Sequence, residues 1–319
     1  MFARFIVRRL CQAVPLLLVV SLLVFLLIHA APGGPLTLYL SNPNVRPQDI
    51  ERLRRALGLD RPLWIQYLSW LGAFVRGDWG YSYADGRPVL ERIIERLPAT
   101  LELVASSMAL GALIAMPVGV IAAIRRHGWF DRLTAALASA GISLPVFWFG
   151  LVLQIVFSVW LGWLPSSGRS TLGGSGLVDR LEHLAMPTTV LALVHAAAWS
   201  RYLRASMGDV LGQPYIAAAR ARGVPAWSVW LRHALRNAVI PVLTVAMIDA
   251  AIMVSGAVVT ESVFAWPGVG SLFTDALAKR DYTVLMAFLM MSSCAVVVLN
   301  LGADLLHRRL DPRIGSGAA

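Results

Sequence analysis

Six long apolar runs alternate with polar segments along the 319-residue chain. A helix needs about 20 apolar residues to cross the hydrocarbon core of a bilayer, and each run reaches that length. The runs lie at Leu10–Ala31, Ala99–Ile124, Leu133–Leu161, Leu184–Leu203, Val239–Val263 and Thr283–Leu306. The pattern therefore predicts an all-α, polytopic membrane protein with six transmembrane helices.

The first apolar run has two interpretations. Arginines precede it and His29-Ala30-Ala31 closes it, which is also typical of a cleaved signal peptide. A signal peptide has an apolar core of about 7 to 15 residues, however, and this run is longer. We expect a retained helix. Under the alternative, the purified chain would begin near Pro32.

Residues 32–98 are polar, mixed in charge and rich in glycine, proline and aromatic side chains, and they predict an external helical insert after the first helix. Gln48–Leu57 fits a helix that ends at Gly58, because glycine readily adopts the left-handed conformation that closes a helix. Pro88–Leu97 fits a second helix, with apolar residues on one face, that stops before Pro98. We expect this second helix to lie along the membrane surface.

The stretch Tyr215–Pro241 follows the fourth run and is too polar to cross a bilayer. Strong helix formers occupy residues 217–222, and Gly223 suits the residue that ends a helix. Pro225 then suits the start of a second helix. Apolar residues at helical spacing predict one face of that helix: Trp227, Trp230, Leu231 and Leu235. The stretch therefore predicts a helix, an elbow and an amphipathic helix.

This pair of helices also has two interpretations. Small alanines let another backbone or a groove come close, and arginines can meet acidic groups at its rim, so the first helix predicts a docking surface. The alternative is an ordinary amphipathic helix that lies in the membrane interface.

Basic residues are distributed unequally between the two sides of the membrane. Fifteen lie in the N-terminus, the loop at 125–132, the stretch 201–236 and the tail at 308–313, against four in the opposite short loops. Because basic loops stay in the cytoplasm, both termini are expected there. The predicted organisation is residues 1–31 as N-terminus and first helix, 32–98 as external insert, 99–306 as a core of helices two to six with cytoplasmic region 206–238, and 307–319 as cytoplasmic tail.

Composition and motifs exclude several other classes. The chain is 57% hydrophobic with a net charge of +10, and the basic residues form short clusters between apolar runs instead of one nucleic-acid-binding patch. Lys279 is the only lysine, so no G-x-x-x-x-G-K-[ST] loop for ATP phosphates is present. The H-E-x-x-H, C-x-x-C and G-x-S-x-G motifs are absent too. Cys11 and Cys294 fall in apolar runs, where packing is expected and a disulfide is not.

Two of the ionisable residues inside the predicted spans, Asp249 and His195, are candidates for a function. A carboxylate near the middle of a membrane is costly, by about 2.5 to 3.5 kcal/mol on translocon scales, so Asp249 requires compensation. It can face a translocation path, or it can be kept neutral or bonded to a polar group of a neighbouring helix. His195 in the fourth run can relay protons or bind a metal, but a single histidine is more typical of a hydrogen-bonded packing residue.

These features together resemble the permease subunits of binding-protein-dependent ABC importers. Their signature is E-A-A-x-x-x-G followed by nine residues and I-x-L-P, here represented by Ala217-Ala218-Ala219, Gly223 and His233–Arg236. Alanine in place of glutamate and the changed second half are features of the dipeptide, oligopeptide and nickel branch. Further matches to that branch run along the chain at Arg8-Arg9, Gly58–Leu63, Arg96–Leu101, Gly141–Pro145, Phe264–Gly270, Arg280–Tyr282 and Asp311–Arg313. Gly34, where an acidic residue is common, and Asp249, where glutamine is common, depart from it.

The resemblance implies a type I ABC importer permease fold in a bacterial inner membrane. It implies a second homologous permease, two ATPase subunits that use ATP and Mg²⁺, an external substrate-binding protein and surrounding lipid as partners, with no nucleic acid and no cofactor bound by this chain. The implied ATPase-docking residues are Tyr215, Ala217, Ala218, Ala219, Arg220, Arg222 and Gly223. Asp249 and His195 are candidates for the path, which carries dipeptides or short oligopeptides.

Three alternatives remain at this point. A nickel or nickel-chelate importer would have the same architecture. A proton-coupled secondary transporter or channel could use Asp249 and His195 without an ATPase, but would have no need of a docking module. A membrane-embedded enzyme would require a nucleophile and base pair, and none is visible.

Overall fold

The computed structural model describes residues 2–30, 46–56, 58–171, 173–174 and 176–310. Within these ranges the chain is built of helices and loops, and an isolated β-bridge joins Tyr81 to Pro88. Gly34, most of the segment between the first helix and residue 46, and the Asp311–Arg313 match lie outside the described residues. The predicted all-α class is confirmed.

Two compact units make up the chain. The first contains residues 1–100 and 267–297, and the second contains residues 101–266 and 298–319. Two long helices, α5 (Val89–Ile124) and α14 (Tyr282–Leu310), contribute residues to both units.

The first unit includes the N-terminal helix and most of the external insert. Besides its parts of α5 and α14, the first unit contains α1 (Phe2–Ala30), which is the N-terminal helix, α3 (Pro47–Ala56), α4 (Leu63–Val75) and α13 (Val269–Ala278). The predicted helix before Gly58 is confirmed as α3, and Gly58 has the left-handed φ of 66°. Phe25 of α1 packs against Tyr67 and Trp70 of α4, and the Tyr67 hydroxyl lies 2.8 Å from the Ser21 hydroxyl.

A buried carboxylate anchors the loop that precedes α5. Asp281, with 1% of its side chain exposed, accepts a hydrogen bond of 2.5 Å from the Ser82 hydroxyl and bonds of 3.2 and 3.3 Å from the backbone N–H groups of Tyr83 and Ala84. Buried carboxylates are stable when donors surround them in this way. The short segment between α13 and α14 thus holds the loop through a single side chain.

We expect Asp281→Ala to destabilise the first unit by about 2 to 3 kcal/mol, because it removes the acceptor of the Ser82 hydroxyl and of the Tyr83 N–H. Thermal unfolding of the purified protein should shift downward, and protease should cut the segment 78–88 faster. Asp275→Ala, at an exposed carboxylate of α13, is the matched control and should change neither reading. Equal stability of the two variants would contradict an anchoring role for Asp281.

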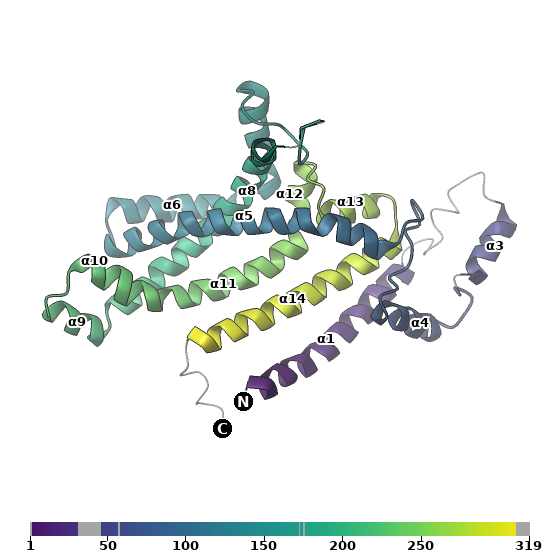
Figure 1. Ribbon diagram of the computed structural model, residues 1–319, viewed down its shortest axis with the longest axis horizontal. Coiled ribbons are helices and arrows are strands. Elements are labelled where there is room, and N and C mark those ends of the chain that lie inside the picture. The colour runs from purple at the N-terminus through teal and green to yellow at the C-terminus, as the bar shows by residue number, and fades with distance from the viewer. Residues whose placement is uncertain (1, 31–45, 57, 172, 175, 311–319) are drawn as a thin grey trace. The chain divides into compact units, whose positions relative to one another are not determined.

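The second unit is a bundle in which α8 packs against α6, α7 and α11 (Figure 1). Its helices are α6 (Trp129–Ser143), α7 (Val146–Leu153), the π-helix η2 (Gln154–Trp160), α8 (Leu177–Leu211), α9 (Pro214–Ala221), α10 (Ala226–Ser228), the π-helix η3 (Val229–Ala234), α11 (Leu235–Gly256) and α12 (Val258–Val263).

Helices α5 and α8 approach each other closely at two glycines. A Cβ atom on Gly119 would lie 2.8 Å from the Cβ of Leu203 and 2.9 Å from the backbone oxygen of Ser200. A Cβ on Gly111 would lie 3.2 Å from the Trp199 ring. Small residues at helix contacts allow such approach in membrane proteins, where packing drives association.

Several predicted boundaries are wrong. The expected surface helix Pro88–Leu97 is continuous with the second span, since α5 runs through Pro98. A proline inside a helix removes one hydrogen bond and can bend the helix without ending it. The fifth run divides into α11 and α12 at Ala257. The insert also contains α4, which was not predicted.

The third predicted span is broken. Its halves, α6 on one side of Leu144-Pro145 and α7 with η2 on the other, meet at an angle of 101°. Among the described residues, five helices are long and apolar enough to cross a membrane, and the bent pair makes six if it is counted as one span. The predicted six-span architecture is therefore confirmed with one bent member.

Candidate functional site

The polar stretch after α8 folds as predicted into a helix, an elbow and a second helical segment. Pro214 occupies the first turn of α9, where a missing N–H costs nothing. Gly223 follows with a left-handed φ of 77°, and its N–H donates to the Arg220 oxygen at 2.9 Å. The chain then enters α10 after Pro225. In Figure 1, α9 and α10 lie together where α8 leads into α11.

Helix α9 has one buried side and one exposed side. Ile216 and Ala219 are buried in a cluster with Val229 and Ala234 of η3. The exposed side carries the other proposed docking residues: Tyr215, Ala217, Ala218, Arg220, Arg222 and Gly223. Ala219, which the resemblance also placed in the docking set, instead packs α9 onto its own chain.

Two residues of the predicted apolar face, Trp227 and Leu231, are exposed in the second helical segment. Trp227 and Leu231 are 62% and 53% exposed, whereas Val229 and Ala234 are fully buried. Val229 and Ala234 belong to the π-helix η3 and pack with α9, while Trp227 and Leu231 lie outside that cluster. The exposed tryptophan and leucine therefore add an apolar element next to the exposed side of α9.

The structure brings together the two ionisable residues proposed for the path. Asp249 of α11 accepts a hydrogen bond of 2.6 Å from the indole N–H of Trp199, and its Oδ2 atom lies 3.4 Å from Nδ1 of His195. The side chains of Asp249 and His195 are 19% and 17% exposed. Asp249 is thus bonded to a polar group of a neighbouring helix, as one of its two interpretations predicted. Its side chain nevertheless stays partly exposed, as a residue facing a path would be.

Trp199 was not singled out from the sequence. It lies four residues after His195 on α8, a spacing that puts two side chains on one face of a helix. Asp249 was expected to need a polar partner. The sequence signal for Trp199 as that partner was its indole N–H, one helical turn after His195.

We expect Asp249→Leu to lower stability by about 1 to 3 kcal/mol, because the buried indole N–H of Trp199 loses its acceptor. Asp249→Asn keeps an acceptor oxygen and should lose much less. Thermal unfolding in detergent checks both. The double variant Asp249→Leu with Trp199→Phe removes donor and acceptor together and should be more stable than Asp249→Leu alone; a further additive loss would show that the two residues do not interact.

A second polar cluster lies at the other end of α8. Glu102 of α5 accepts hydrogen bonds from Arg169 at 2.7 Å and from Arg180 at 2.5 and 2.6 Å. The Arg169 guanidinium also lies 5.9 Å from the centre of the buried Trp266 ring. These contacts fix the loop between η2 and α8 against α5 and the turn after α12.

The described residues contain no group of three or more histidine, cysteine, aspartate or glutamate side chains placed to hold a metal ion. The candidate features of this region are the exposed side of α9 and the bonded residues between α8 and α11.

Comparison with known proteins agrees with this architecture. The family described as "Binding-protein-dependent transport system inner membrane component" matches residues 115–316, and the family of its N-terminal part matches residues 1–104. The oligopeptide transport system permease protein AppB of Bacillus subtilis is 43% identical, covering 98% of this chain and 99% of its own length. The glutathione transport system permease protein GsiC of Escherichia coli K12 is 40% identical, covering 97% and 98%.

Solved structures show the same fold at lower identity. A chain of the inward-facing MetNI methionine ABC transporter superimposes with a TM-score of 0.58 at 19% identity, covering 70% of this chain and 98% of that one. A chain of an amino acid ABC transporter gives 0.53 at 14% identity, covering 69% and 94%. The fold is thus that of ABC importer permeases.

This chain belongs to the family of binding-protein-dependent transport system inner membrane components. It is a multi-pass inner-membrane permease of an importer.

Proposed function

We propose that this chain forms half of the translocation path of a peptide importer and couples it to ATP hydrolysis by partner subunits. The observation that carries the coupling role is α9: a short helix with small and basic residues on its exposed side, seated through Ile216 and Ala219 on a fully buried core. A helix of this kind suits a groove in a partner, because its backbone can come close and its arginines can pair with acidic groups.

The mechanism follows from how α9 is attached. It lies between α8 and α11, which are joined at Asp249, so a displacement of α9 moves both helices. When two ATPase subunits close on ATP and Mg²⁺, docked helices follow them and the attached spans change the side to which the path opens. This chain then contributes geometry and binds no cofactor itself. A second homologous permease supplies the other half of the path.

Peptides are the proposed cargo. The two relatives compared above are permeases for oligopeptides and for glutathione, which is itself a short peptide. A nickel or nickel-chelate cargo is the second candidate, and an external binding protein would select between them. We further propose that Asp249 and His195 border the path, since both keep partial exposure inside the membrane bundle.

The arginine distribution supports a topology with both termini and α9 in the cytoplasm. In that orientation α9 faces the compartment that contains ATP, and residues 32–98 face the compartment of the binding protein. A cysteine placed at Ala218 should react with a membrane-impermeant thiol reagent only in inverted vesicles, after Cys11 and Cys294 are replaced by serine.

The decisive experiment is purification of the tagged chain in mild detergent from its native membrane, with mass spectrometry of stoichiometric partners. We expect a second permease and two ATPase subunits. The associated binding protein is then tested by calorimetry against dipeptides, longer peptides and nickel, which separates the two cargo candidates. A chain that associates only with itself and transports in vesicles without ATP would overturn the proposal in favour of a proton-coupled carrier.

A further inference from the structure

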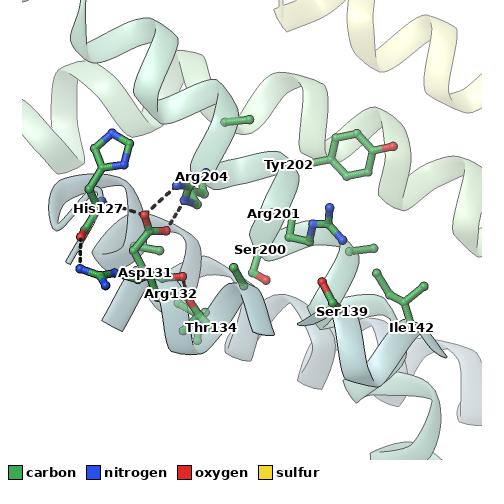
Figure 2. A pocket seen from close by; sticks show the side chains of 15 residues that line it. His127, Asp131, Arg132, Thr134, Ser139, Ile142, Ser200, Arg201, Tyr202 and Arg204 are labelled. Atoms are coloured by element: carbon green, nitrogen blue, oxygen red, sulfur yellow. Dashed lines mark hydrogen bonds and ion pairs between the residues drawn. The ribbon is translucent and has the colours of Figure 1, made fainter. Parts of the chain in front are cut away.

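A cavity of about 1000 Å³ opens in the second unit between the end of α5, α6 and α8 (Figure 2). Alanines leave the space: Ala122 of α5, Ala135 of α6, and Ala198 and Ala205 of α8 all line it. It lies apart from α9, and neither His195 nor Asp249 lines it. No role in docking or in the proposed path accounts for this cavity.

The polarity of the cavity changes along its length. At one end, Arg204 of α8 pairs with Asp131 at the start of α6, with a second bond of 2.7 Å between Arg204 Nη2 and Asp131 Oδ2. Towards the other end of α6, Gly141 comes close to Ala197 of α8, so the two helices run antiparallel along the cavity. The wall there contains Ile142 and Ser139, and Arg201 lies part-way along the cavity, between the Asp131–Arg204 pair and Ser139 (Figure 2).

Positive charge at the charged end exceeds what the chain neutralises. Asp131 is fully used, since it bonds both Arg204 and the backbone N–H of His127 at 2.9 Å. Among the residues that the structure describes, Arg132 donates only to the His127 backbone oxygen, at 3.3 Å. Within the described residues Arg201 makes no hydrogen bond or ion pair, and Figure 2 shows it apart from the Asp131–Arg204 pair. Two guanidinium groups thus line the cavity without a carboxylate.

The charged end lies at a membrane–water boundary. The adjoining turn between α5 and α6 contains Arg125 and Arg126, which belong outside hydrocarbon. Beyond this end, α6 exposes Leu133 and Leu137, as a helix in contact with lipid does. The cavity therefore begins among headgroups and extends towards hydrocarbon depth.

We propose that this cavity binds one anionic phospholipid, with its headgroup attracted by the two arginines that lack a carboxylate, Arg132 and Arg201 on either side of the Asp131–Arg204 pair, and an acyl chain along Ala198 and Ile142. Basic pockets between transmembrane helices are suited to anionic headgroups, and a lining that combines guanidinium groups with aliphatic side chains matches an amphiphile better than a soluble anion. A helix from another protein would fill an apolar cavity equally well, but would have to supply a buried carboxylate for each arginine. Lipid supplies the anion and the chain in one molecule.

The test is native mass spectrometry of the purified complete transport complex, delipidated and then given phosphatidylglycerol or phosphatidylcholine. We expect one phosphatidylglycerol to be retained per copy of this chain. The double variant Arg132→Gln, Arg201→Gln should bind it roughly 25-fold more weakly, because each arginine at a headgroup contributes roughly fivefold in affinity. The control Arg125→Gln, Arg126→Gln removes the same amount of charge from the adjoining turn between α5 and α6, outside the cavity, and should bind like the wild type.

Three results would overturn the proposal. Equal retention by the two double variants would mean that general surface charge holds the lipid. Displacement by millimolar inorganic phosphate or glycerol phosphate would mean a site for small soluble anions. Covalent capture of the second permease by a photo-crosslinking residue placed at Ser139, in native membranes, would mean that a protein helix occupies the cavity. Size-exclusion profiles and circular dichroism of each variant ensure that binding is compared among folded complexes.

Discussion

Replacing Ala218 by tryptophan is expected to reduce ATP-driven uptake by about 30-fold while leaving the chain folded in the membrane. Ala218 lies on the exposed side of α9, so the larger side chain meets no atom of its own core. In a docked complex, however, it would hold the helix away from its groove. Disrupting the centre of a protein interface costs about 2 kcal/mol or more, which corresponds to this factor.

The measurement is uptake of a labelled peptide into proteoliposomes that contain the whole complex, together with ATP hydrolysis and the amount of copurified ATPase. Ala136→Trp introduces the same side chain at an exposed alanine of α6 and serves as the control. We expect normal coupling in the control. Full uptake by Ala218→Trp with intact assembly would remove α9 from the docking surface.

The second large effect is expected for Gly119→Leu, which should prevent stable folding of the second unit. Its Cβ would lie 2.8 Å from the Leu203 Cβ and 2.9 Å from a backbone oxygen, and a backbone atom cannot move aside as a flexible side chain can. Forced insertions into a packed core cost about 3 kcal/mol at the upper end of their usual range. For a membrane bundle held by packing, we expect little folded protein.

Expression level, monodispersity and thermal unfolding in detergent measure this effect. Gly176→Leu is the matched control, because a Cβ at Gly176 meets nothing within 4 Å. Gly111→Ala should fall between them, since its new methyl group would contact the Trp199 ring at 3.2 Å. A Gly119→Leu protein as stable as the Gly176→Leu protein would show that α5 and α8 can separate without loss.

The membrane spans could be predicted from the sequence because their hydrophobicity is a local property. The ends of the helices and the angles between them could not be predicted, because they depend on packing against neighbouring helices. Pro98 is a reasonable end for a helix in isolation, yet α5 continues through it. Pro145 does mark the break in the third span, but the angle of 101° between the halves depends on packing against α8 and α12.

The candidate site was likewise predicted where its signals were local. Gly223 and the alanines before it indicated a helix with a sharp end, and α9 has this form. The exposure of Trp227 was not foreseen, because helical spacing shows which residues share a face but not whether that face packs against the core. The bond between Asp249 and Trp199 joins residues 50 positions apart, and no periodic pattern reports such a pair.

The bond from Asp249 to Trp199 has a mechanical consequence. A single helix loaded at its tip flexes and absorbs part of the displacement. Here the hydrogen bond between Trp199 and Asp249 joins α8 to α11. It lies roughly 20 Å from the end of α8, at a rise of about 1.5 Å per residue. Two helices joined in this way bend less than two separate helices. A displacement of α9 therefore reaches the Asp249–Trp199 bond with its amplitude largely preserved.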